Sequence, residues 1–193
     1  ACNIEHVDAV LYTHHHSDHV AGLDDLRRFN LSGQGPLPVY AAQDTLDRLA
    51  VMFDYAFRHD PDYPSSKPAL EPRLIGGPWE LYGQRIEPIP LLHGELPVLG
   101  FRFGGLAYCT DCSHIPDASW KLLADLDVLV LDGLRKRPHP THFNLDQAVE
   151  AAGKIGAKQT YFTHIAHELG HAEANANLPA NMALAYDGQI VEL

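Results

Sequence analysis

The sequence predicts a mixed α/β fold. Short apolar runs bounded by glycine, proline or polar clusters are typical of strands, and they alternate with longer stretches whose apolar residues recur at helical spacing. Seven runs are expected to form strands, at residues 9–12, 37–41, 86–92, 98–103, 106–110, 128–131 and 159–163. Four stretches are expected to form helices, at residues 20–29, 44–57, 117–126 and 145–155. Residues 182–186 and 189–193 flank an Asp-Gly turn and are expected to form a terminal hairpin.

The second of these helices is defined best by its sequence. Asp44 is a residue type that caps helix N-termini, so we expect it to cap this one. Its apolar side chains recur at helical spacing and are expected to face the core: Leu46, Leu49, Met52 and Phe53.

The composition is that of an ordinary globular protein and most simply describes one domain spanning residues 1–193. Hydrophobic residues make up 46% of the chain and charged residues 20%. The chain has 14 basic and 25 acidic residues, a net charge of −11 and a pI near 5.5. This balance argues against a surface built to hold long nucleic acid. Bound metal ions would offset part of the negative charge.

The three cysteines do not describe a disulfide framework, because their number is odd and two of them, Cys109 and Cys112, are only three positions apart. A redox pair or half of a zinc site is the alternative interpretation of this spacing. Asp111 lies between the two cysteines and no second pair accompanies them, which disfavours both. No apolar stretch approaches the length of a membrane span and no signal-peptide pattern is visible, so a reducing, cytoplasmic location is expected, with no membrane partner.

The densest group of chemically active residues follows the first predicted strand, in the run Thr13-His14-His15-His16-Ser17-Asp18-His19. In an extended segment alternate side chains share a face, so His14, His16 and Asp18 are expected to converge while His15 points away. His19, at the start of the next helix, approaches from beside them. Imidazole and carboxylate together suit zinc, manganese or iron. The alternatives are a solvated polar turn or an adventitious nickel-binding tract, and four potential ligands in six residues disfavour both.

Three further potential ligands follow strands that are far apart in the chain. His93, Asp111 and His164 each come directly after an apolar run, as a site at the edge of a sheet requires. A lone histidine such as His93 is usually structural. The position of His93 indicates a metal ligand only because Asp111 and His164 also directly follow predicted strands.

These residues resemble the signature of the metallo-β-lactamase superfamily, in which His-x-His-x-Asp-His is followed by a lone histidine, an aspartate after a strand and a final histidine. The words Gly22-Leu23-Asp24-Asp25-Leu26-Arg27 and Thr163-His164-x-x-His167-Glu168 are similar to those of one branch, the phosphoribosyl cyclic phosphate phosphodiesterases. The resemblance runs from end to end of the chain. It implies an αββα sandwich that holds two metals at its edge. It also implies that the strands preceding the motif in the family are absent from this sequence.

The resemblance further implies a binuclear hydrolase containing two manganese or zinc ions. His14, His16 and His93 would bind one ion, Asp18, His19 and His164 the second, with Asp111 bridging. Asp18 and Asp111 would thus serve catalysis, and hydroxide generated at the two metals would attack phosphorus in a cyclic ribose phosphate or nucleotide. His142, which resembles a non-ligand active-site histidine of the branch, is the expected general acid.

Substrate contacts are expected in two places. Residues 58–83 show little periodicity, which favours a substrate-facing loop carrying Arg58, His59 and Tyr63 over a plain surface excursion. Residues 135–137 are the one dense basic patch, and Arg135 is the candidate to orient a phosphate; a solvated loop is the alternative.

Two histidines near the C-terminus carry a different signal. His167 matches a residue that joins N-terminal cysteines in a structural zinc site of the resembling phosphodiesterases, and those cysteines are missing here. Residues 167–171 also fit the metalloprotease pattern His-Glu-x-x-His. Gly170 is a poor residue for a helix interior, which argues against that interpretation.

Three other functions compete. A ribonuclease Z-like endonuclease is disfavoured by the acidic balance, and a glyoxalase II-like thioester hydrolase by the context of Asp111 and His164. The third is a non-catalytic metal-binding or dimerisation module, because a chain lacking its first strands exposes sheet edge and apolar surface. A small phosphodiester or nucleotide-like substrate is therefore the expected partner, and a homodimer is one expected consequence of the exposed edge.

Overall fold

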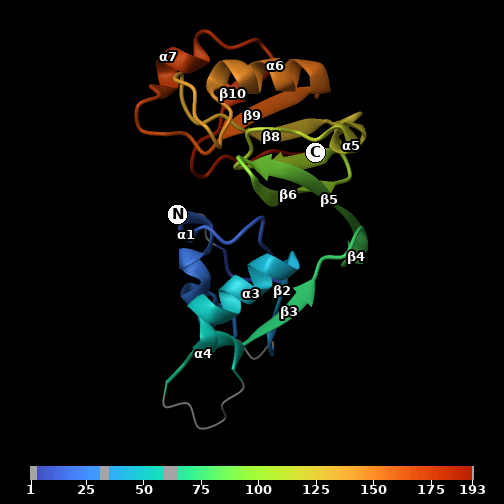
Figure 1. Ribbon diagram of the computed structural model, residues 1–193, viewed down its shortest axis with the longest axis vertical. Coiled ribbons are helices and arrows are strands. Elements are labelled where there is room, and N and C mark those ends of the chain that lie inside the picture. The colour runs from blue at the N-terminus through green and yellow to red at the C-terminus, as the bar shows by residue number, and fades with distance from the viewer. Residues whose placement is uncertain (1–3, 31–34, 59–64, 193) are drawn as a thin grey trace. The chain divides into compact units, whose positions relative to one another are not determined.

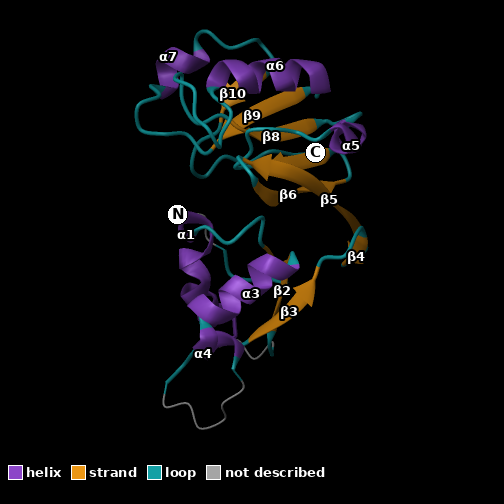
Figure 2. Ribbon diagram, in the orientation of Figure 1, coloured by secondary structure: helices purple, strands orange, loops and turns teal. Residues whose placement is uncertain are grey.

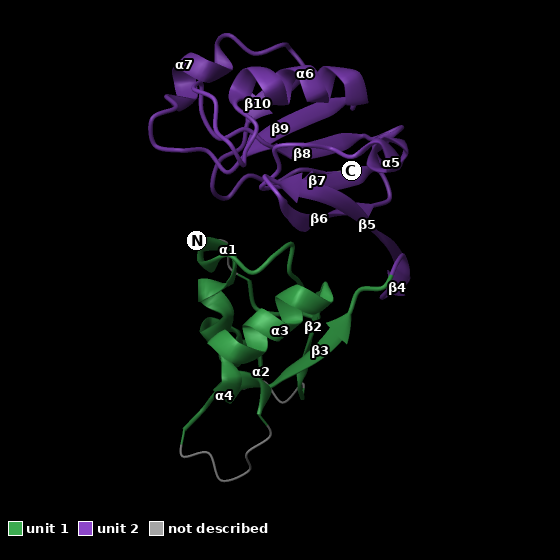
Figure 3. Cartoon of the chain, viewed as in Figure 1, with its two compact units in different colours: residues 1–76 green, residues 77–193 purple. Residues whose placement is uncertain are grey.

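The computed structural model describes residues 4–30, 35–58 and 65–192, and its chain divides into two compact units. The first unit is Ala1–Gly76 and the second unit is Gly77–Leu193 (Figure 3). Each unit has its own sheet and its own buried apolar cluster. Across the described ranges, no helix combines the length and the apolar character needed to cross a membrane.

The first unit contains a three-stranded parallel sheet in the order β1-β2-β3. Its strands are β1 (Val10–Leu11), β2 (Leu37–Ala41) and β3 (Leu70–Leu74). Short helices connect them: α1 (Ser17–Val20), the 3-10 helix η1 (Ala21–Leu26), α2 (Arg27–Asn30), α3 (Gln43–Met52) and α4 (Asp54–Phe57) (Figure 2). Val39 in the central strand and Leu49 in α3 are completely buried in one apolar cluster, so α3 packs against the sheet.

The second unit contains a seven-stranded sheet in the order β10-β9-β8-β7-β6-β5-β4. Its strands are β4 (Trp79–Leu81), β5 (Gln84–His93), β6 (Leu96–Phe103), β7 (Leu106–Cys109), β8 (Val128–Asp132), β9 (Gln159–Thr163) and β10 (Met182–Leu184). The pairs from β4 to β7 are antiparallel and those from β7 to β10 are parallel. Because β7, β8 and β9 run the same way, their C-terminal ends lie at one edge of the sheet.

Helices of the second unit pack on this sheet. They are α5 (Asp117–Trp120), the 3-10 helix η2 (Lys121–Leu123), α6 (Leu145–Ile155) and α7 (His171–Asn175). Helix α6 lies over the parallel strands (Figure 1), and its buried alanines Ala148 and Ala152 share a cluster with Leu129 and Leu131 of β8. A capping box begins the helix, in which Asn144 accepts from the backbone of Gln147 and the Gln147 side chain accepts from the backbone of Asn144. This cap fixes the point where the chain turns into the helix, two residues after His142.

All seven predicted strands are present in the described residues, together with two that were not expected, β3 and β4, and with β10, which was expected as one strand of a hairpin. The predicted C-terminal hairpin is wrong. Strand β10 pairs in parallel with β9, and residues 185–192 form no strand. The physical reason is that pairing with β9 buries Met182 and Leu184 in the apolar cluster of the second unit, whereas Ile190, after the Asp-Gly turn, stays exposed.

The prediction of an irregular stretch over residues 58–83 is wrong for β3 and β4. Prolines suggested a loop there, but Pro72 lies in β3 at the edge of its sheet, where a strand tolerates the missing N–H group. His59 and Tyr63 lie outside the described residues.

The second predicted helix is present but differs in three respects. It begins at Gln43 after Ala42, so Asp44 is not its N-cap but lies in its first turn. It is interrupted at Phe53, whose backbone leaves the helical region. Met52 is 47% exposed and is therefore not a core residue, because it lies where α3 ends and the chain turns away from the sheet.

Candidate metal centre

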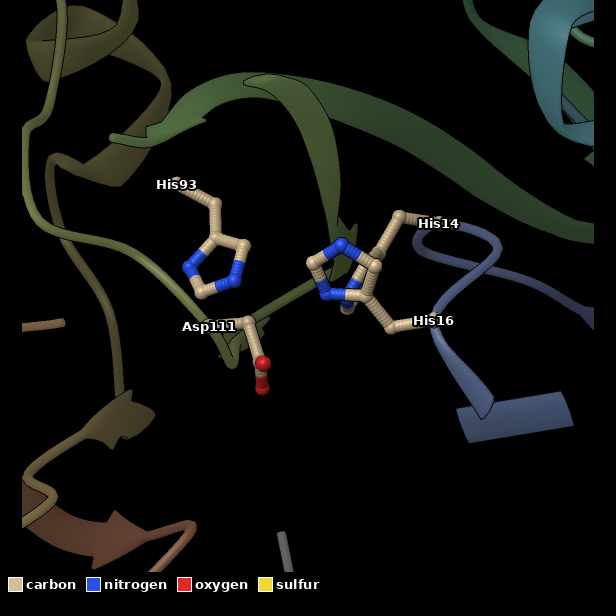
Figure 4. A group of neighbouring side chains, drawn as sticks. All are labelled: His14, His16, His93 and Asp111. Carbon is tan, nitrogen blue, oxygen red and sulfur yellow. The ribbon is translucent and has the colours of Figure 1, made fainter. Parts of the chain in front are cut away.

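The first unit brings its candidate ligands together within one short segment, His14, His16, Asp18 and His19, which we call the first half-site. His14 is completely buried, and its Nδ1 lies 3.0 Å from the Thr13 hydroxyl, so Nε2 is the nitrogen that can bind a metal. The rings of His14 and His16 lie side by side, with centroids 4.6 Å apart (Figure 4). The ring of His19 lies 4.4 Å from that of His14.

The expectation that this segment stays extended as far as Asp18 is wrong. Helix α1 begins at Ser17, so Asp18 lies in its first turn rather than on the face shared by His14 and His16. Asp18 is close to His19 instead, with its Oδ2 3.5 Å from the Nε2 of that ring. The helix start thus moves Asp18 off the face shared by His14 and His16, while the ring of His19 remains beside that of His14.

The second unit delivers His93, Asp111 and His164, the second half-site, from the ends of three strands. His93 is the last residue of β5, Asp111 follows β7 and His164 follows β9. Figure 4 shows the side chains of His93 and Asp111, which offer ligand atoms within 4.8 Å of each other. Nε2 of His164 lies 3.4 Å from Oδ1 of Asp111. The parallel order of β7, β8 and β9 accounts for this meeting of residues 111 and 164.

Hydrogen bonds orient two members of the second half-site. Nδ1 of His93 donates to the carbonyl oxygen of Thr141 at 2.7 Å, which leaves Nε2 as the metal-binding nitrogen. The Thr110 hydroxyl donates to Oδ1 of the buried Asp111 at 2.8 Å. Both bonds are of the kind that fixes a ligand before a metal arrives.

The backbone is strained at two of these three ligands. Asp111 has φ 51° and His164 has φ 58°, in the left-handed region that residues other than glycine rarely adopt. Such conformations persist only where the surrounding structure imposes them, and they are concentrated at functional sites. Here they turn each side chain away from the direction of the strand that precedes it.

Asp132, a residue that the sequence reasoning missed, completes the cluster of the second unit. It is the last residue of β8 and is completely buried. Its Oδ2 accepts hydrogen bonds from Nδ1 of His142 at 2.9 Å and from the backbone N–H of Cys112 at 3.2 Å. Burial raises the pKa of Asp132, and the hydrogen bond from His142 opposes that increase. The sequence did contain a signal for this residue, because Asp132 comes at the end of an apolar run, as the predicted ligands His93, Asp111 and His164 do.

His142 lies between the two outer histidines of this cluster. Its ring stacks on that of His164, with centroids 4.8 Å apart and planes 13° from parallel, and its centroid is 4.4 Å from that of His93. The N–H of Phe143 donates to the carbonyl of Cys112 at 2.7 Å and thereby holds the segment in place. Asp132, His142 and His164 each offer one ligand atom within 4.8 Å of the others. The residues of the second half-site, His93, Asp111 and His164, already offer the imidazole and carboxylate groups that suit a divalent transition metal.

The basic residues of the predicted anion-binding patch form ion pairs with carboxylates of the same chain. Arg135 lies 3.3 Å from Glu168 and also donates to two backbone carbonyls, while Arg137 donates to Glu168 at 2.7 Å. Lys136 lies 2.6 Å from Glu173. The guanidinium of Arg58 is similarly placed, 2.8 Å from Asp54. Arg135, Lys136 and Arg137 are thus paired with carboxylates of residues 168–173, and Arg58 with a carboxylate of α4.

The remaining histidine and cysteine signals do not form sites in the described part of the chain. His167 belongs to no group of three potential ligands there. His171 begins α7 after the cap residue Gly170, so residues 167 and 171 do not share a helix and the protease pattern is not realised. Cys109 and Cys112 are buried and form no disulfide. Burial raises the pKa of Cys109 to about 12 and that of Cys112 well above its usual value, which makes both thiols poor nucleophiles.

Comparison with known proteins identifies the family. Residues 2–165, which include every predicted ligand of the binuclear centre, match the sequence model of the beta-lactamase superfamily domain. The chain belongs to the metallo-β-lactamase superfamily. A crystal structure described as a new diphosphatase from the PhnP family is 44% identical, with a TM-score of 0.88, and the match covers 96% of this chain and 70% of that one. This places the chain in the PhnP-like branch and confirms the predicted resemblance and the mixed α/β fold.

Two other relatives of this metallo-β-lactamase superfamily chain bear on its interpretation. An octanoyltransferase of Porphyromonas gingivalis is 36% identical over 189 residues, which are 96% of this chain and 38% of that protein. The chain thus spans about two fifths of the length of that relative. Zn²⁺-bound PqqB from Methylobacterium extorquens has the same fold, with 21% identity and a TM-score of 0.71 over 96% of this chain and 73% of that one. The chain therefore has the fold of metal-dependent hydrolases and the histidine and aspartate clusters that suit divalent metals.

Proposed function

We propose that this chain is a binuclear metal-dependent phosphodiesterase. Under this proposal His14, His16 and His93 would hold one divalent ion, Asp18, His19 and His164 would hold the other, and Asp111 would contribute to both. The observation that carries the proposal is the buried Asp132–His142 pair, stacked on His164 and adjacent to His93. It supports the proposal because a histidine able to donate a proton lies beside candidate ligands of its own unit, the second.

The donor set supports two hard or borderline divalent ions, zinc or manganese. Nitrogen and carboxylate oxygen are their preferred ligands, and no cysteine sulfur is offered among the grouped residues of the described ranges. When bound, two such ions supply a water activated near neutral pH and neutralise charge on the phosphoryl oxygens. The chain's contribution is to orient the ligands, as the bonds from His93 to Thr141 and from Thr110 to Asp111 do.

His142 is the proposed general acid for the leaving oxygen. Its Nδ1 donates to Asp132, so Nε2 is the atom that can hold and deliver the proton. Asp132 fixes this tautomer and the ring orientation, and the stacked ring of His164 restricts His142 from one face. A phosphodiester needs such a donor because its leaving alkoxide is a strong base.

Phosphoryl chemistry is favoured by the relative of known structure. The protein 44% identical to this one is described as a diphosphatase, and diphosphates and phosphodiesters require the same in-line attack at phosphorus. The name octanoyltransferase belongs to a protein more than twice as long, of which this chain matches 38%. An acyl-transfer nucleophile is not evident here, since both cysteines of the described ranges are buried and have raised pKa values.

The proposal is tested by assaying bis-p-nitrophenyl phosphate beside S-lactoylglutathione, with protein first stripped of metal and then supplied with Mn²⁺ or Zn²⁺. We expect hydrolysis of the phosphodiester that is lost on chelation and restored by metal. The His142→Ala variant should bind the same amount of metal, and it should lose more activity on a cyclic nucleotide, whose leaving alkoxide is a strong base, than on bis-p-nitrophenyl phosphate, whose p-nitrophenolate leaves without a proton. Cleavage of the thioester alone would show that the phosphodiesterase assignment is wrong, and metal binding without turnover of either substrate would favour a non-catalytic module.

A further inference from the structure

A hollow of about 390 Å³ opens beside His164 in the second unit. Its walls come from the end of β9 and from the segment that follows β10, and they include Ile165, His171, Tyr186 and Asp187. This volume is within the range of small-molecule sites. Because His164 is a candidate metal ligand, a molecule in the hollow would lie next to the reacting phosphoryl group. The proposed catalytic residues His142 and Asp132 do not line it.

His171 forms one wall of the hollow and is held in a single orientation. Its Nε2 donates to the carbonyl of Ala185 at 3.2 Å, and its Nδ1 accepts from the side-chain amide of Asn175 at 3.1 Å. The Asn175 amide is itself fixed, because its oxygen accepts from the N–H of Leu184 at 2.8 Å. Since both ring nitrogens are engaged, His171 offers a ligand its ring rather than a lone pair.

Tyr186 and Asp187 complete the wall with different chemistry. Tyr186 is 62% exposed, although large aromatic side chains are usually covered, and its ring packs edge to face against that of His171 with centroids 6.4 Å apart. The contact with His171 holds the tyrosine ring at the rim of the hollow. The neighbouring carboxylate of Asp187 accepts hydrogen bonds and carries negative charge, so it favours hydroxyl or amino groups over a further phosphate.

We propose that this hollow binds the nucleoside part of the substrate, with the base stacked on Tyr186 and a hydroxyl or amino group donating to Asp187. The inference rests on the proposed phosphoryl chemistry at His164 and deepens it by separating two substrate classes. A nucleotide ester would fill the aromatic wall, whereas a bare ribose cyclic phosphate has no planar ring to place there. Stacking on an aromatic side chain tolerates every base, so discrimination among bases is expected to be weak.

Two esters with the same leaving group test the inference. Thymidine 5′-monophosphate p-nitrophenyl ester and methyl p-nitrophenyl phosphate release the same product and differ only in what the hollow would hold. We expect kcat/KM to favour the thymidine ester. In Tyr186→Ala that preference should fall by roughly tenfold, the size of one lost base–aromatic stack, and Tyr186→Phe should restore most of it. Asp187→Asn should lower it less.

Tyr82 provides the matched control, because it is a tyrosine of the same unit that is 72% exposed and does not line the hollow. Tyr82→Ala should leave the preference unchanged. Calorimetric binding of thymidine 5′-monophosphate, measured with and without Tyr186→Ala, tests the hollow without any turnover. If the methyl ester is hydrolysed but thymidine gives no advantage and binding is insensitive to Tyr186, the inference is wrong and the proposed function stands. If neither ester is hydrolysed but the nucleotide binds and the binding depends on Tyr186, the proposed function is wrong, whereas nucleoside binding in the hollow is supported.

Discussion

The two half-sites are built by opposite means. The first takes four candidate ligands from six consecutive positions, between a two-residue strand and a single helical turn. The second takes three ligands spread from position 93 to position 164, which follow β5, β7 and β9, strands that all run in the same direction in one sheet. Local sequence therefore specifies the first half-site, whereas sheet register specifies the second.

This difference shows in how the ligands are held. In the first half-site, His14 is oriented by its own neighbour, Thr13. In the second, His93 is oriented by Thr141, 48 positions away, and His142 by Asp132 on another strand. We therefore expect the second half-site to be sensitive to changes outside the ligand set, and the following substitutions test that expectation.

The largest effect is expected at Asp111. Removing a residue that only orients a metal ligand typically costs 10–100-fold in metal affinity or activity. Because Asp111 is itself a proposed ligand, Asp111→Ala should lower phosphodiester turnover by more than about 100-fold. Asp125→Ala is the matched control, because Asp125 also has a positive φ, 54°, and lies outside the site. It should remain close to the parent in turnover and in bound metal. Equal losses in the two variants would mean that the backbone conformation, not the carboxylate, is responsible.

A smaller effect is expected from Asp132→Asn. The amide can no longer fix the tautomer in which His142 donates through Nδ1, so kcat should fall by roughly 10–100-fold while the metal content stays the same. Asp127→Asn, which alters a carboxylate paired with Lys158 on the surface, should have no effect. Combined with His142→Ala, the Asp132 substitution should add little, and additive losses would contradict the role assigned to this pair.

Two glycine substitutions compare packing at the second half-site with packing away from it. Gly94 has φ 65°, and a Cβ atom there would lie 2.8 Å from Cγ2 of Thr141, the residue that orients His93. Gly94→Ala should destabilise the protein by about 1–3 kcal/mol and weaken metal binding. In α6, a Cβ on Gly153 would meet nothing within 4 Å, so Gly153→Ala should stabilise by roughly 0.5–1 kcal/mol.

Chemical denaturation reports both changes. Gly94→Ala behaving like Gly153→Ala, with no loss of metal, would mean that Thr141 moves freely and does not fix His93.

The smallest effect is expected from relieving strain at His164. His164→Gly and His164→Ala remove the same imidazole, but only glycine adopts φ 58° without steric cost. The glycine variant should therefore be more stable than the alanine variant by about 1 kcal/mol when both are free of metal. Urea unfolding measures the difference. An alanine variant as stable as the glycine variant would show that the backbone relaxes once the ring is gone.

The same contrast explains how much the sequence could predict. The histidine run of the first half-site, the strand ends at His93, Asp111 and His164, and the helix over residues 145–155 follow from local patterns that the structure retains. Asp132 was missed because its sequence neighbourhood was interpreted as the start of the loop that carries the basic patch. It is nevertheless the last residue of a buried strand, β8, and Asp111 similarly follows the end of β7.

The errors have a common physical origin in tertiary pairing. Strand β10 pairs with β9 rather than with its sequence neighbour, and β3 tolerates Pro72 because it is an edge strand. Neither fact is visible until the order of the strands is known. The compensation of Arg135 by Glu168 is likewise a contact between distant segments.

The central claim is that the two half-sites serve one pair of metals. Anomalous diffraction from a crystal of the chain, recorded at the zinc and manganese edges, tests it most directly. We expect two anomalous peaks about 3.5–4 Å apart. One should be ligated by His14, His16 and His93 and the other by Asp18, His19 and His164, with Asp111 in contact with both. A single ion, or ions bound by residues of one unit only, would contradict it.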